Sequence, residues 1–238
     1  LTLCLVMGLR IIDPSFIESI RLRYFDTLLT HDIKQSNISV VNIDEETLKI
    51  KGQFPFPRNL YADIIKDIYN HGAGLVAFNL FLPEHDRFGQ DDALTQVLKD
   101  YPIILPQIGT SDNITQSYKP FRPGVSIIGT GEVGVNYESI LPNIQVFNDN
   151  ASGIGIVNTL PEVDGITRRI PMLVSSKEKL YPSFGLEILR VAAGDISFQV
   201  KVNKGSIEAV RIPKFGKIQT DSLGRIWIKP SKHKEYSA

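Results

Sequence analysis

The sequence predicts an α/β fold with a mixed, largely parallel central sheet, helices on both faces and an antiparallel C-terminal part. An amphipathic helical pattern over residues 58–71 lies between two β-rich runs, residues 38–43 and 75–82. The order strand, helix, strand is typical of parallel strands joined by a right-handed crossover. Short β-rich runs follow residue 194, with a turn signal at residues 221–224. Short strands separated by tight turns favour antiparallel pairing.

Composition and motifs exclude several classes of function. The chain has 238 residues, an apolar fraction of 42% and a formal net charge of +0, which is ordinary for a globular protein. It has no basic stripe interleaved with aromatic residues, so we expect no nucleic-acid partner. Cys4 is the single cysteine, which excludes an intramolecular disulfide and a cysteine zinc cluster. The histidines lack metal-ligand spacing and no catalytic triad pattern occurs, so we expect no cofactor and no catalysis.

The first nine residues form an uncharged apolar run. A bilayer span needs about 20 apolar residues, so this run alone is too short to cross a membrane. Two interpretations stay open, namely the outer end of a truncated transmembrane helix or an amphipathic first helix of the domain. We assign residues 1–12 to the end of a truncated transmembrane helix and residues 13–238 to one domain.

Asp13 and Pro14 predict a helix start, because Asp is a favoured cap and Pro suits the first helical position. We expect this helix to reach residue 30 and to pack on the domain. Its apolar residues at helical spacing are Ile17, Ile20, Tyr24 and Leu28. Residues 38–43 predict a buried strand, after which Asp44 caps a short helix that ends at Gly52.

The remaining elements follow from the same kinds of signal. Two prolines within residues 54–58 exclude a helix there. In chain order we then predict the helix of residues 58–71 with Gly72 as its stop, a strand at 75–82, a helix at 93–99 capped by Asp91 or Asp92, a strand at 103–105, a loop at 109–123, strands at 153–158 and 166–174 joined as a hairpin by Asp164 and Gly165, and a helix from Pro182 to Gly194.

Several polar residues follow the first two predicted strands and form the candidate binding site. They are Asp44, Glu45, Asn79, Glu84 and Asp86. Parallel strands end at the same edge of a sheet, so these groups and Arg58 are expected to converge. Such a set suits a magnesium or calcium ion, or a zwitterionic small molecule. The structural alternative is helix capping by Asp44 and salt bridges to Arg58, with Asp44 as the first candidate partner.

Two further motifs have a structural alternative. Arg168 and Arg169 alternate in direction if they lie on a strand, so one of them, with Arg168 as the candidate, can contact a ligand. Gly129, Gly131 and Gly134 match the spacing of a dinucleotide-binding loop. Pro142 follows too soon for the helix that this mechanism needs, so we interpret the run as a glycine-rich loop.

Motifs along nearly the whole chain together resemble one family, the type-two CHASE domains (cyclases/histidine kinases associated sensory extracellular). They are residues 23–26 (RYFD), 43–45 (IDE), 54–58 (FPFPR), 76–79 (VAFN) with Glu84 and Asp86, 155–158 (GIVN), 164–171 (DGITRRIP), Pro182 and Ser183, Leu186 and Glu187, 220–221 (TD), and 224–225 (GR). The chain has Asn79 where the family usually has Asp, and Phe54 and Phe56 where it has tryptophan. Asn79 weakens the case for a complete carboxylate site.

The resemblance implies a bacterial transmembrane receptor at the inner membrane, with this domain on the periplasmic side. It implies an unknown small-molecule or ion signal and an output domain in the same chain, which is an adenylate or guanylate cyclase, a histidine kinase or a serine/threonine kinase. A homodimer is a further possible partner. Two alternatives stay open, a secreted metal-dependent hydrolase that uses Asp44, Glu84 and Asp86, and a dimerisation module without a small ligand.

Overall fold

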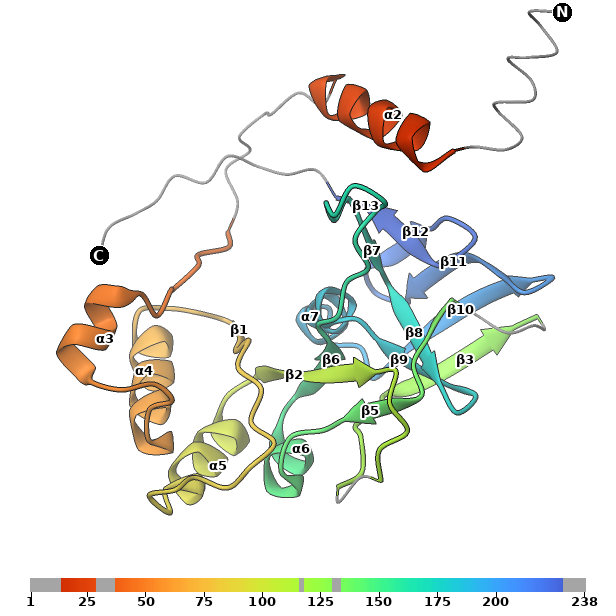
Figure 1. Ribbon diagram of the computed structural model, residues 1–238. Coiled ribbons are helices and arrows are strands. Elements are labelled where there is room, and N and C mark those ends of the chain that lie inside the picture. The colour runs from red at the N-terminus through yellow and green to blue at the C-terminus, as the bar shows by residue number, and fades with distance from the viewer. Residues whose placement is uncertain (1–13, 29–36, 116–117, 130–133, 229–238) are drawn as a thin grey trace, which may run out of the picture. The chain divides into compact units, whose positions relative to one another are not determined.

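Figure 1 shows the computed structural model of the chain. The residues that it describes are 14–28, 37–115, 118–129 and 134–228. They divide into two compact units. The small unit holds the described residues among 1–41, 159–170 and 227–238, and the large unit holds those among 42–158 and 171–226. Residues 1–12 lie outside the described part of the chain. Within that part, no helix is long and apolar enough to cross a membrane.

Most of the predicted helices are confirmed. The described helices are α2 (Ser15–Leu28), α3 (Glu45–Lys51), α4 (Arg58–Asn70), α5 (Asp91–Asp100), α6 (Gln145–Asn150) and α7 (Phe184–Ala192). Asp44 caps α3 as predicted, since its side chain accepts a hydrogen bond from the Thr47 N–H. The predicted cap of α5 is wrong, because Gln90 is the cap residue and Asp91 and Asp92 lie in the first turn. Helix α6 was not predicted.

The strands belong to several small sheets in place of one large one. They are β1 (Val76–Ala77), β2 (Ile103–Thr110), β3 (Gly124–Ile128), β4 (Val135–Asn136), β5 (Ser139–Leu141), β6 (Gly153–Ile156), β7 (Arg169–Pro171), β8 (Leu173–Ser176), β9 (Lys179–Pro182), β10 (Ser197–Asn203), β11 (Ser206–Ile212), β12 (Gly216–Gln219) and β13 (Arg225–Trp227). The α/β class is therefore confirmed, with parallel and antiparallel pairs mixed, while a single central sheet is not.

Strand β2 organises the sheet that carries the predicted site. It pairs parallel with β1 and with β6, and antiparallel with β5. Ile103, Leu105 and Ile154 on one face belong to an apolar core with side chains of α4, α5 and α6. On β6, Gly153 and Gly155 alternate with Ile154 and closely approach α7. Helices therefore cover both faces of this sheet.

Helix α7 also contributes to a second core. There, Leu186 packs with residues of β10 and β11, in the sheet ordered β12-β11-β10-β3. Three of these strands are antiparallel neighbours, which confirms the antiparallel C-terminal part, although β3 joins β10 in parallel. A Cβ at Gly155 would lie 2.5 Å from the Phe184 Cα. Only glycine therefore lets α7 approach β6 this closely.

One predicted strand and one predicted hairpin are not found. Residues 38–43 form no strand, and Ile38, Val40 and Val41 are exposed by 78%, 66% and 67%. The crossover unit observed is instead β1–α5–β2. The predicted hairpin of residues 153–174 is also wrong, because β6 pairs with β2, β7 with β13, and β8 with β4 and β9. Both predictions relied on local β-propensity, which does not specify a partner strand.

Helix α2 presents the opposite face from the one predicted. Of the four residues predicted to pack on the domain, Ile20, Tyr24 and Leu28 are exposed by more than half and Ile17 is partly buried, while Leu22 is buried. The alternation of apolar residues around this helix leaves two candidate faces, and spacing alone does not decide between them.

The glycine-rich motif is structural where it is described. Gly129 follows β3 and has a positive φ of 104°, and a Cβ there would collide with the Val202 carbonyl oxygen. Gly134 precedes strand β4 and no helix. Gly131 lies outside the described residues. The described part of the motif therefore shows no strand–helix junction of the kind that a dinucleotide site requires.

Candidate functional site

Arg58, the first residue of α4, is the centre of the first candidate site. Its side chain is buried, with 6% of the residue exposed. Its Nη2 donates to the Glu84 carbonyl oxygen at 3.1 Å, and its Nε lies 3.7 Å from an Asp91 carboxylate oxygen. The Asp86 carboxylate accepts from the Arg58 backbone N–H at 3.3 Å. A carboxylate at this position is stabilised by the positive end of the helix dipole.

Asp91 holds the loop of residues 84–90 against α4. Its carboxylate accepts from the Asp86 N–H at 3.1 Å and lies 2.7 Å from the His85 Nδ1. The Nε2 of the same imidazole lies 3.5 Å from the Tyr118 hydroxyl. The Asp86 carboxylate also accepts from the Gln90 N–H. The loop is therefore folded around two carboxylates, and Arg58 neutralises part of their charge. We call Arg58, Glu84, His85, Asp86 and Asp91 the Arg58 cluster.

The structure brings together part of the predicted site. Arg58, Glu84 and Asp86 meet, and acidic groups do hold the arginine. The first-choice partner was wrong, since Asp91 pairs with Arg58 while Asp44 accepts from both the N–H and the hydroxyl of Thr47. These hydrogen bonds also lower the pKa of Asp44. Asn79 is exposed just beyond β1 and shows no bond to the Arg58 cluster in the described structure.

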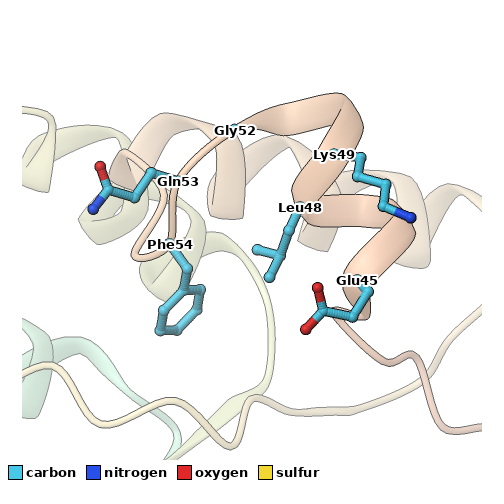
Figure 2. Close-up of a pocket in the computed structure, with 6 residues that line it drawn as sticks. All are labelled: Glu45, Leu48, Lys49, Gly52, Gln53 and Phe54. Carbon is cyan, nitrogen blue, oxygen red and sulfur yellow. The ribbon is translucent and has the colours of Figure 1, made fainter.

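Glu45 lies in a different place, at the side of an open hollow below α3. The hollow has a volume of about 580 Å³ and is lined by Glu45, Leu48, Lys49, Gly52, Gln53 and Phe54. Figure 2 shows the side chains of Leu48 and Phe54 directed into the same space. The lining is mostly apolar, so it does not suit the ion site that Glu45 was expected to complete.

Arg168 is the centre of a second cluster, in the small unit. Its guanidinium binds two carboxylates, each through two hydrogen bonds. The Asp164 carboxylate accepts hydrogen bonds from Nη1 at 2.9 Å and from Nη2 at 2.8 Å. The Asp26 carboxylate, on α2, accepts hydrogen bonds from Nε at 2.8 Å and from Nη2 at 2.7 Å. Arg168 is 4% exposed. Its expected ligand contact is thus taken by two acidic side chains of the same unit.

Aromatic side chains complete this cluster. The centres of the Phe25 and Trp227 rings are 4.9 Å apart. The Arg169 guanidinium carbon lies 5.0 Å from the centre of the Trp227 ring. Arg169 also forms an ion pair with Glu162 at 2.6 Å. The Ile228 N–H donates to the Arg168 carbonyl oxygen at 2.8 Å. Helix α2, the loop after residue 159 and the end of β13 therefore meet at one place. We call Phe25, Asp26, Asp164, Arg168 and Trp227 the Arg168 cluster.

The charges of the Arg168 cluster are mutually stabilised. Hydrogen bonds from Arg168 lower the pKa of Asp164 to about 2, and they lower the pKa of Asp26 as well. The same bonds raise the pKa of Arg168. All three groups are therefore charged at neutral pH, so the cluster holds two negative charges against one buried positive charge.

Sequence reasoning missed Asp26, Asp91 and Trp227. Residues 23–26 and 164–171 were both recognised as motifs, but nothing in either predicted that they meet across 142 positions, as Asp26 and Arg168 do. Asp91 was interpreted as a helix cap, and acidic residues in a first helical turn are common enough to hide a second role. Trp227 is the single tryptophan of the chain, which was the one available signal.

The carboxylates do not form a metal centre where the chain is described. In that part of the chain no group of three or more His, Cys, Asp or Glu side chains could hold a metal ion. The hydrolase interpretation therefore gains no site from Asp44, Glu84 and Asp86 as they are placed there.

Comparison with known proteins gives one match. The family model described as CHASE2 domain matches residues 1–238, the whole chain. No curated protein and no solved structure matches the chain.

Replacing Arg58 tests the first cluster. Arg58→Ala should lower the free energy of unfolding by about 3 kcal/mol, because the Asp91 carboxylate loses its buried cationic partner and keeps the exposed His85 imidazole and the Asp86 N–H. Arg87→Ala is the matched control, since this exposed arginine lies over the Phe88 ring and should cost less than about 1 kcal/mol. Urea denaturation measures both values. Equal losses in the free energy of unfolding would mean that Arg58 contributes no more to stability than a solvated arginine.

Acid titration tests the second cluster. The pKa of Asp164 is depressed from 3.8 to about 2, so its contribution to stability is complete above pH 3.8 and is lost as the pH falls towards 2. Trp227 fluorescence should therefore change over this interval in the wild type. The change should be much smaller in Asp164→Asn, whereas Asp63→Asn, at an exposed position of α4, should behave as the wild type. An identical acid transition in Asp164→Asn would contradict the assignment.

Proposed function

We propose that the chain detects a signal outside the inner membrane of a bacterium and passes it to an output domain in the cytoplasm. The chain belongs to the CHASE2 family, whose members are extracellular sensory domains and not catalysts. The output domain would be a nucleotide cyclase, a histidine kinase or a serine/threonine kinase. A signal that prefers one arrangement of the domain shifts the population towards it. The shift is limited by the difference in affinity, which in allosteric proteins is typically about 1–3 kcal/mol.

The contacts within the small unit support this proposal. Helix α2 comes first among the described elements and β13 last, and both reach the Arg168 cluster. A sensor must couple the segment that enters the domain to the segment that leaves it. Ion pairing between Asp26 and Arg168, together with the contact between Phe25 and Trp227, provides such a coupling.

We place the signal at the solvent side of the Arg58 cluster. Glu84 and His85 are exposed there, next to an arginine and two carboxylates whose positions are fixed by hydrogen bonds. Charged side chains that are already held in position need little reorganisation when a ligand binds, so less of the binding free energy is lost. The mixture of one guanidinium, one imidazole and several carboxylates suits a zwitterionic small molecule better than a divalent ion, because Asn79 removes one carboxylate and Asp44 is engaged elsewhere.

A second candidate function is a dimerisation module without a small ligand. Helix α2 favours it through four apolar side chains spaced four residues apart, each more than 60% exposed, namely Phe16, Ile20, Tyr24 and Leu28. Side chains at this spacing form a ridge that packs against another helix.

A ligand screen tests the proposal. We expect at least one zwitterionic metabolite to raise the melting temperature of the wild type, since a hundredfold excess over Kd adds about 2.7 kcal/mol. The gain should shrink in Glu84→Gln and persist in Asp63→Asn, which carries the same charge change on α4. Equal stabilisation of both variants would place the site elsewhere. No stabilising ligand, together with a dimer in sedimentation that Ile20→Asp abolishes, would favour the dimerisation module.

A further inference from the structure

The two carboxylates on Arg168 differ in how they are held. Asp164 lies four residues away on the same loop, and its side chain is 2% exposed. Asp26 belongs to helix α2, and its side chain is 38% exposed. Each accepts two hydrogen bonds from the guanidinium. One carboxylate is therefore a permanent buried partner, while the other is a partly solvated partner supplied by a separate helix.

This difference lowers the cost of releasing α2. Breaking a buried ion pair is costly mainly because it leaves one charge buried without a partner. If α2 moves away, Arg168 keeps both of its hydrogen bonds to Asp164. Asp26 already has access to water and regains its full hydration. The penalty is therefore smaller than for a pair with a single counter-ion, and what remains of it is the Arg168 Nε, which donates to Asp26 and not to Asp164.

Among the residues that the structure describes, α2 makes few buried apolar contacts, so the ion pair is a large part of its attachment there. Leu22 is the one buried residue of the described helix. Phe25 adds its contact with the Trp227 ring, and Trp227 itself is 50% exposed. Phe16, Ile20, Tyr24 and Leu28 are each more than 60% exposed, and Ile17 is partly buried. A helix that buries so little apolar surface against the described residues is expected to have a low free energy of local opening.

We infer that the pair of Asp26 and Arg168 is a reversible latch, which holds α2 on the loop of residues 159–170 and can open while the rest of the fold stays intact. Opening separates Phe25 from Trp227 and so uncouples α2 from the end of β13. The latch is a property of the small unit and does not depend on the sensory function proposed above or on any ligand. It differs from the permanent pair of Glu187 and Arg190 in the large unit, where Glu187 is fully buried.

Amide hydrogen exchange of the full chain measures the opening directly. In Asp26→Asn, peptides of α2 should exchange about two- to fivefold faster than in the wild type, which is the range for an ion pair with a partly exposed partner. Peptides of α4 should exchange at the wild-type rate. Glu18→Gln is the matched control, because it removes an ion pair with Arg21 that stays within α2. It should leave the exchange of residues 22–28 unchanged.

Salt provides a second test, in which the response of the wild type is compared with that of Asp26→Asn. Raising the salt from 0.1 M to 1 M shortens the screening length from about 10 Å to about 3 Å. Exchange of α2 should accelerate in the wild type and should not respond in Asp26→Asn. The latch is overturned if α2 exchanges equally fast in both proteins, if salt affects both equally, or if α4 accelerates together with α2, which would indicate global unfolding.

Discussion

The small unit depends on the need to neutralise one buried cation. Arg168 is almost completely removed from water, and a guanidinium at that position requires carboxylates with matching geometry. Asp164 supplies one from the same loop and Asp26 supplies the other from α2. Asp26 and Arg168 come from segments far apart in the sequence. The ion pair between them therefore also determines where the first described helix attaches.

Most of the family motifs have structural explanations. Gly155 permits the close approach of α7, and the side chain of Asn158 bonds to both the N–H and the carbonyl oxygen of Gly109. Ser183 caps α7, and the Asp221 carboxylate closes the turn before β13. Motifs with such roles preserve the fold. The charged residues of the Arg168 cluster differ because they join separate segments, and we therefore propose that the signal is transmitted through them.

Local signals in the sequence predicted local structure well. Asp44 as a cap and the amphipathic face of residues 58–71 were sufficient to predict α3 and α4. Long-range partners were not predictable in the same way. The apolar run at residues 38–43 indicated a strand but not its partner, and the structure leaves it exposed. Likewise, the sequence offers several acidic residues as partners for the one Arg58 side chain. Nothing in it favours Asp91 over Asp44.

The central claim is that α2 and the end of β13 meet at the Arg168 cluster. A nuclear Overhauser measurement in solution tests it most directly, because Trp227 is the single tryptophan and its indole protons can be assigned without ambiguity. Their contact with the Phe25 ring, 4.9 Å away between centres, should give strong cross-peaks that Phe25→Leu removes. Assigned Phe25 and Trp227 resonances without any cross-peak, under conditions where the rest of the fold is intact, would contradict the account.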